Sequence, residues 1–240
     1  MPFLQAALNG ARRREDYPTI PWTSDALAQS AAEAVAAGAA AIHVHVRDAR
    51  GSESLEPADV ARTVQALRSA VPGVPIGVST GAWIVPNTER RHQLVASWTE
   101  LPDYASVNFD EPGSELLASL LVARGIGIEA GAANTNAAAR LARSGLAPGC
   151  LRVLLEPMVP DLDDAVRLLQ DVETMLDQAA ITIPRLLHGI DGTAWPMIGE
   201  AARRGLQTRI GFEDTVTLPD GSPAPSNAAL VAAARRFFDD

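Results

Sequence analysis

The stretch Ile42-His43-Val44-His45-Val46-Arg47-Asp48 places two histidines two residues apart within an apolar, β-branched run. Side chains on a strand alternate between its two faces, so His43 and His45 are expected to point the same way. Two imidazoles on one inward face indicate a metal site, because histidine is the commonest metal ligand near neutral pH. Two hydrogen-bonded core histidines are the alternative interpretation of this stretch alone.

Outward from this stretch, the chain repeats one pattern, a short apolar strand followed by a helix. We expect strands at residues 3–8, 41–46, 75–79, 104–108, 125–129, 151–156, 185–188 and 207–212. Helices are expected at residues 23–37, 57–70, 89–98, 114–124, 135–143, 161–178, 193–204 and 227–238. Strict alternation of strand and helix indicates parallel strands joined by right-handed crossovers.

Eight such repeats in 240 residues predict an α/β fold, a closed (β/α)8 TIM barrel that forms a single domain over residues 1–240. An open, doubly wound sheet is the alternative. Such a sheet often carries a glycine-rich dinucleotide site between a strand and a helix. In this sequence Gly125-Ile126-Gly127 falls inside an expected strand, so that fingerprint is missing. We therefore expect no dinucleotide site.

The composition limits the classes of partner. The chain carries a net charge of −9, and its one basic run, Arg12-Arg13-Arg14, is followed at once by Glu15 and Asp16. Nucleic acid and acidic membrane surfaces are therefore not expected as partners. Cys150 is the only cysteine, which excludes an internal disulfide. No apolar run reaches the ~18 residues that cross a bilayer, and no secretory signal is recognisable, so a cytoplasmic protein is expected.

In a (β/α)8 barrel, the active site lies at the C-terminal ends of the strands. Polar residues at these predicted ends come from seven strands: His43, His45, Arg47, Asp48, Ser79, Thr80, Ser106, Asn108, Glu129, Glu156, His188, Asp191, Arg209, Glu213 and Asp214. Some have simpler interpretations. Asp48 before Gly51 favours a turn residue, His188 a hydrogen-bonded core histidine, and Arg12, taken alone, a solvated side chain.

The stretch Arg209-Ile210-Gly211-Phe212-Glu213-Asp214 places three charges in and after the last strand. Such charges are costly to bury unless they are paired or bound to a metal. The first strand of a closed barrel neighbours the second and the eighth, so His43, His45 and Glu213 can converge on one ion. Two imidazoles and one carboxylate form a catalytic ligand set for zinc, with ferrous iron or another divalent ion not excluded. Asp214 would remain available for proton transfer.

With these motifs the chain resembles the β-keto acid cleavage enzymes. Seven stretches carry the resemblance: Asn9-Gly10-Ala11, Ala37-Gly38-Ala39, residues 43–48, Ser79-Thr80-Gly81, Ser106-Val107-Asn108, residues 209–214 and Ser226-Asn227-Ala228. The resemblance implies a zinc-dependent (β/α)8 barrel that forms a homo-oligomer, a dimer or a tetramer. It implies cleavage of a 3-keto acid with acetyl-CoA, which gives acetoacetate and a new acyl-CoA.

The same resemblance implies roles for single residues. It makes His43, His45 and Glu213 the zinc ligands, Asp214 the essential acid and Arg209 the arginine beside the reaction intermediate. The expected substrate-binding residues are Ser79, Thr80, Ser106, Asn108 and Glu129. The chain departs from the family pattern in the first loop, where Arg12 stands near the position of an acid and Glu15 is a shifted candidate.

Two other functions fit the same residues. A metal-dependent aldolase or hydrolase would use the same ion and Asp214 without CoA. A non-catalytic, metabolite-binding metal protein would need the ligands but no free acid. Dependence of turnover on acetyl-CoA separates the first of these from the cleavage enzyme.

Overall fold

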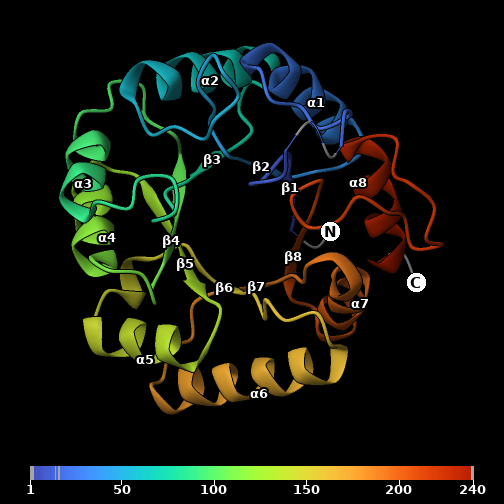
Figure 1. The fold of residues 1–240 in the computed structure, drawn as a ribbon. Coiled ribbons are helices and arrows are strands. Elements are labelled where there is room, and N and C mark those ends of the chain that lie inside the picture. The colour runs from blue at the N-terminus through green and yellow to red at the C-terminus, as the bar shows by residue number, and fades with distance from the viewer. Residues whose placement is uncertain (1–2, 14, 16, 239–240) are drawn as a thin grey trace.

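Eight parallel strands close into a barrel within residues 3–13, 15 and 17–238, which the computed structural model describes (Figure 1). The strands are β1 (Leu4–Ala7), β2 (Ala41–Val44), β3 (Ile76–Ser79), β4 (Tyr104–Asn108), β5 (Gly127–Ala132), β6 (Arg152–Leu155), β7 (Arg185–Leu187) and β8 (Gln207–Ile210). They follow one another around the barrel in sequence order, and β8 closes it by pairing with β1. The predicted (β/α)8 barrel is confirmed, and the open sheet is excluded.

Helices form the outer ring of the barrel (Figure 1). They are α1 (Ser24–Ala36), α2 (Pro57–Ala70), α3 (Thr88–Ala96), α4 (Ser114–Ala123), α5 (Thr135–Ser144), α6 (Leu162–Gln178), α7 (Ala194–Arg204) and α8 (Asn227–Arg235). Short 3₁₀ helices lie at Ala147–Gly149, Asp191–Thr193 and Arg236–Phe238. Within the described ranges, no helix has both the length and the apolar character to cross a membrane. Arg14 and Asp16 of the charged run after β1 lie outside the described residues.

The sequence explains where the helices begin and which face they bury. The side chains of Thr23, Asp161 and Ser226 each accept a hydrogen bond from the backbone N–H three residues on. Each cap satisfies a donor that has no partner inside its helix, which contributes about 1 kcal/mol. On α1 the buried side chains recur every three or four residues, at Leu27, Ala31 and Ala34, so one apolar stripe packs on the sheet.

The strand register places the predicted site residues at one end of the barrel. Ala7 of β1 pairs with His43 of β2, and Gln5 of β1 pairs with Arg209 of β8. β2 ends at Val44 and β8 at Ile210, two residues earlier than expected in each case. His45 and Glu213 therefore follow the strands on short loops, on either side of β1.

One strand differs from its expected position in a way that matters for the site. β5 begins at Gly127 and not at residue 125, because Gly125, with a φ of +76°, turns the chain after α4. The strand then continues to Ala132. Glu129 consequently lies in the middle of β5, inside the barrel, and the prediction that it ends the strand is wrong.

Candidate active site

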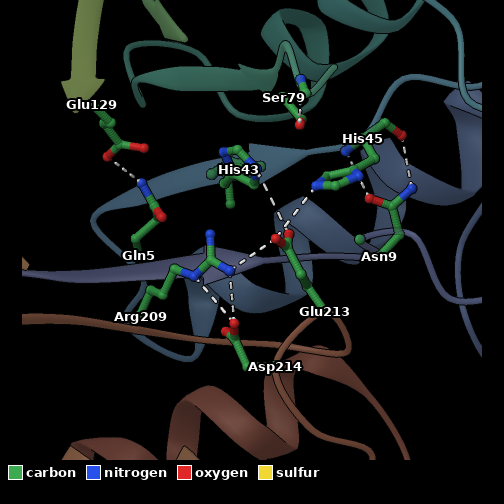
Figure 2. A network of polar contacts seen from close by, with 12 residues as sticks. Gln5, Asn9, His43, His45, Ser79, Glu129, Arg209, Glu213 and Asp214 are labelled. Carbon is green, nitrogen blue, oxygen red and sulfur yellow. Dashed lines mark hydrogen bonds and ion pairs between the residues drawn. The ribbon is translucent and has the colours of Figure 1, made fainter. Parts of the chain in front are cut away.

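Two histidines and a glutamate meet at the C-terminal end of the barrel (Figure 2). His43 is 1% and His45 3% exposed. Glu213 lies 3.7 Å from His43 Nε2 through Oε2, and 3.3 Å from His45 Nε2 through Oε1. One ligand atom from each residue lies within 4.8 Å of the others. The predicted convergence from β2 and β8 is confirmed as geometry.

Two glycines allow Glu213 to reach the histidines. A Cβ at Gly211 would lie 1.9 Å from the carbonyl oxygen of Ala7, so only glycine lets the end of β8 pass this close to β1. Gly10, with a φ of +59°, lies against Glu213, and a Cβ there would be 2.5 Å from Glu213 Cγ. The Asn9-Gly10 and Arg209–Asp214 motifs therefore meet in space, and each requires its glycine for close backbone approach.

His45 is held at both its backbone and its ring. Asn9 Nδ2 donates to the carbonyl oxygen of His45 at 2.8 Å, and Asn9 Oδ1 accepts from the His45 N–H at 2.9 Å. On the ring, Nδ1 lies 2.6 Å from Glu53 Oε1. Trp83 donates its indole N–H to the same carboxylate at 3.1 Å and stacks on His45, with centroids 6.0 Å apart. A proton held on Nδ1 leaves Nε2 free to bind a cation.

The cluster fits a divalent metal ion. Metal–ligand distances of ~2.0–2.2 Å place two ligands on one ion about 3–4 Å apart, which agrees with the two contacts above. Glu213 Oε2 is buried without a hydrogen-bond partner among the described residues. Such an atom carries a full desolvation cost unless something binds it. Two neutral imidazoles and one carboxylate also leave coordination positions open, which suits a catalytic ion.

Charge acts differently on the three groups. Burial lowers the pKa of His43 to about 3, so this imidazole is neutral at pH 7. Burial also opposes protonation of His45, but the carboxylates of Glu213 and Glu53 outweigh it and raise the pKa of His45 to about 9. Although burial raises the pKa of Glu213, Arg209 and both histidines hold it well below the usual value. Below pH 9 and without a metal ion, His45 therefore carries a second proton, which would have to leave before Nε2 could bind a metal ion.

Arg209 links the glutamate to the second acid. Its Nη2 donates to Glu213 Oε1 and to Asp214 Oδ1, both at 2.8 Å, and its Nε lies 3.1 Å from Asp214 Oδ1 (Figure 2). Burial opposes its charge, but the two carboxylates raise the pKa of Arg209. Asp214 Oδ2 is buried and has no hydrogen-bond partner among the described residues. Asp214 thus presents one oxygen bound to arginine and one free.

His188 lies between Asp214 and Glu156. The sequence favoured a hydrogen-bonded core histidine at this position. Its Nδ1 is 3.3 Å from Asp214 Oδ1 and its Nε2 is 3.4 Å from Glu156 Oε2. It is 1% exposed. Burial and Arg209 lower its pKa, but the two carboxylates outweigh them, and its pKa is raised. His188 is therefore a buried histidine held between two acids.

A cavity of about 650 Å³ opens above the cluster. His43, His45, Glu213 and Arg209 line it, as do three of the predicted substrate residues, Ser79, Ser106 and Asn108. Asn108 is held by Glu111, whose Oε1 accepts from its Nδ2 at 3.0 Å. These residues come from β2, β3, β4 and β8 or from the loops that directly follow them, so the strand ends build one mouth, as the fold predicts.

The other three predicted residues do not line this cavity. Thr80 donates through Oγ1 to the carbonyl oxygen of Ser106 at 2.6 Å, which ties β3 to β4. Glu129 is fully buried and accepts from Gln5 Nε2 at 2.7 Å (Figure 2), and burial raises its pKa. Asp214 is 2% exposed and lies beyond Arg209. Thr80 and Glu129 therefore support the barrel interior and the strand ends.

Sequence patterns missed three residues of the site. Glu53 and Trp83 follow strand ends by several residues on loops, where no periodicity assigns a direction to the side chain. Glu111 likewise lies after β4, and its Oε2 accepts from Arg91 Nη1 at 2.8 Å. The position of Glu53 eight residues after His45 carried no signal, because its contact with the ring arises from an antiparallel bridge between Arg47 and Glu53.

Glu53→Gln is expected to weaken zinc binding about 10- to 100-fold without unfolding the protein. Glutamine keeps the shape of the side chain but removes the negative charge beside His45 Nδ1. The measurement is the zinc dissociation constant in a competition titration with a chelator. Glu56→Gln is the matched control, because Glu56 is exposed and pairs with Arg90 on the surface. Equal affinity in Glu53→Gln and Glu56→Gln would contradict this role for Glu53.

The sequence of the chain is similar to those of known enzymes. The sequence profile of the beta-keto acid cleavage enzymes matches residues 3–240. A 3-keto-5-aminohexanoate cleavage enzyme from Acetoanaerobium sticklandii is 27% identical over 260 residues, which cover 95% of this chain and 88% of that enzyme. A 3-oxoadipate:acetyl-CoA acetyltransferase from Cupriavidus necator is 30% identical over 253 residues, with 96% and 86% covered.

Solved structures share the fold. The ternary complex of ObcA with a C4-CoA adduct and oxalate superimposes with a TM-score of 0.71 over 91% of this chain, at 17% sequence identity. This chain spans 63% of the length of that ObcA chain. At this level of identity the likeness concerns the barrel.

Proposed function

Because the chain belongs to the beta-keto acid cleavage enzyme family, we propose that it converts a 3-keto acid and acetyl-CoA into acetoacetate and a new acyl-CoA. One observation carries the proposal: the His43–His45–Glu213 cluster lies at the wall of a cavity that Arg209 shares. The names of the two relatives, a 3-keto acid cleavage enzyme and an acetyl-CoA acetyltransferase, support the same reaction class.

His43, His45 and Glu213 would hold the metal ion, with zinc as the proposed ion. Bound there, zinc would supply Lewis-acid polarisation to the carboxylate and keto oxygens of the substrate. The cavity adds hydroxyls and an amide from Ser79, Ser106 and Asn108. These neutral donors can bind the polar end of a keto acid and so fix its orientation.

Arg209 and Asp214 supply the charges that the reaction needs. Asp214 is the proposed base for the C2 proton of the keto acid, with Oδ1 held by Arg209 and Oδ2 without a partner among the described residues. Because Asp214 lies beyond Arg209 and does not line the cavity, the proton would reach it through a water or side chain that does. Arg209 lines the cavity and can donate to an oxyanion that develops there. Its link to both carboxylates restricts the guanidinium to one position, which reduces the reorganisation needed during the reaction.

The proposed reaction conserves every atom and electron. The C2 carbanion attacks the thioester carbon of acetyl-CoA and releases the CoA thiolate. The thiolate then attacks the original keto carbon, and the bond between C2 and that carbon breaks. C2 recovers its proton, which yields acetoacetate and the acyl-CoA of the remaining chain. No oxidant or reductant is consumed.

The experiment is turnover of a panel of 3-keto acids, among them 3-oxoadipate and 3-keto-5-aminohexanoate, with and without acetyl-CoA. We expect acetoacetate and one new acyl-CoA in equal amounts, and only when acetyl-CoA is present. Cleavage of a keto acid without acetyl-CoA would favour the metal-dependent aldolase or hydrolase instead. A homo-oligomer and a cytoplasmic location stay predictions.

A further inference from the structure

A second cavity of about 510 Å³ adjoins the catalytic one. The two share Ala11 and Arg12 in their linings. The walls of the second cavity are the loops that follow β1 and β2. Four arginines line it: Arg12, Arg13, Arg47 and Arg50. We refer to it as the arginine cavity.

Arg47 holds the two loops together from inside. Its Nη2 donates to the carbonyl oxygens of Gly10 and Arg12, at 2.7 and 2.8 Å, and its Nη1 donates to that of Gly51 at 2.8 Å. It is 8% exposed. Because Arg47 donates these hydrogen bonds to backbone oxygens of both loops, it fixes the shape of the cavity. Its positive charge nevertheless acts on whatever lies in front of it.

Arg50 is presented on a rigid turn. Asp48 Oδ1 accepts from the backbone N–H groups of Arg50 and Ser52, at 2.8 and 3.0 Å, which confirms Asp48 as a turn residue. The guanidinium of Arg50 is exposed and forms no hydrogen bond or ion pair with the described residues. Arg12 is also not a freely solvated side chain, because it bonds to Asp191 and to the carbonyl oxygen of Glu213.

The local charge is opposite in sign to that of the whole chain. The arginine cavity sets four guanidinium groups against two carboxylates, Glu15 and Glu53, in a chain whose net charge is −9. Glu53 is engaged by His45 and Trp83. The catalytic cavity has the reverse balance, with Asp110, Glu111, Glu156 and Glu213 against Arg12 and Arg209. Apart from a bound metal ion, the charges therefore favour a polyanion in the arginine cavity over the catalytic one.

Phosphate is the anion that suits clustered guanidinium groups, which bind its oxygens in pairs. The same cavity also offers an aromatic surface. Trp22 lines it and lies against Gly51, where a Cβ would be 3.3 Å from Trp22 Cε3. An indole next to arginines suits a planar base that carries phosphates.

We propose that the arginine cavity binds the phosphorylated adenosine end of acetyl-CoA, with its phosphates on Arg12, Arg13 and Arg50 and its adenine against Trp22. The pantetheine arm would then pass over Ala11 and Arg12, so that the thioester reaches the metal cluster. This inference rests on the proposed function, since it assigns the acetyl-CoA of that reaction to a place.

The first test compares thioesters. Arg50→Ala and the double variant Arg13→Ala/Arg50→Ala are assayed with acetyl-CoA and with acetyl-pantetheine, which has no phosphate. We expect the ratio of kcat/KM for acetyl-CoA to that for acetyl-pantetheine to fall about tenfold or more for each arginine removed. Arg167→Ala is the control, because Arg167 is exposed on α6 and pairs with Asp164. A ratio equal to wild type in the double variant would overturn the proposal.

The second test needs no turnover. Binding of adenosine 3′,5′-bisphosphate to the purified protein is measured by calorimetry at two salt concentrations. Binding that weakens with salt and is lost in the double variant supports the site. Binding that the double variant retains overturns it. Arginine-dependent binding in a protein that turns over no thioester would refute the proposed reaction and still support the phosphate site.

Discussion

We expect the wild-type protein to bind about one metal ion per chain, and His43→Ala, His45→Ala and Glu213→Ala should each lose it. Each variant removes one of three ligands from a cluster whose ligand atoms lie within 4.8 Å of one another. With two protein ligands left, zinc affinity should fall by more than the about 10- to 100-fold typical of losing a residue that merely supports a ligand. Activity should fall to background, because the remaining groups cannot polarise the keto acid.

The measurement is metal content after extensive dialysis, by elemental analysis on the folded protein. His92→Ala serves as the control, since His92 lies on α3, outside the described site, and is not fully buried. Circular dichroism separates loss of metal from loss of fold. A His43→Ala/His45→Ala double variant that still holds one zinc per chain would contradict the ligand assignment.

Asp214→Asn should keep the metal and the fold but lose turnover by about 10² to 10⁴-fold in kcat, as expected for the loss of a general base. Asparagine has nearly the same shape and still accepts a hydrogen bond from Arg209 through its amide oxygen. It cannot take the C2 proton. The measurement combines steady-state kinetics with metal analysis of one variant.

The contacts with Arg209 give Asp214 a second possible role. Because Asp214 lies beyond Arg209, its charge also positions that guanidinium. A base and a positioning residue differ in their effect on the kinetic constants. Asp214→Asn lowers kcat with KM unchanged in the first case, and raises KM in the second. Asp177→Asn, which alters an exposed acid near Arg185, is the control. Wild-type kcat in Asp214→Asn would redirect the search to Glu156, which lines the cavity.

The sequence alone predicted the fold and the convergence of His43, His45 and Glu213, because both follow from the periodicity of the strands and their order in a closed barrel. Alternation along a strand puts His43 and His45 on one face regardless of what surrounds them. Repetition of strand and helix leaves few topologies, and closing the barrel brings the end of β8 beside β2 across β1. The predicted strand order therefore places Glu213 near the two histidines.

Tertiary structure decided which polar side chains reach the cavity and which support it. Glu129 had the sequence position of a strand end, but the turn at Gly125 shifted β5, and the carboxyl faces Gln5 in the barrel interior. Thr80 follows a strand end but bonds to its neighbour's backbone. Depth within a barrel depends on where each strand starts, and a turn sets that start without changing the alternation of the strand.

The sequence did not predict the contacts of the loops either. Glu53 and Arg12 lie in loops that have no period, so nothing in the chain assigns their side chains a direction. Their partners, His45 for Glu53 and the backbone of Glu213 for Arg12, are 8 and 201 residues away along the chain. Only the closed barrel brings these loops over one mouth, because their positions follow from the strands they connect and their own residues determine only the turns.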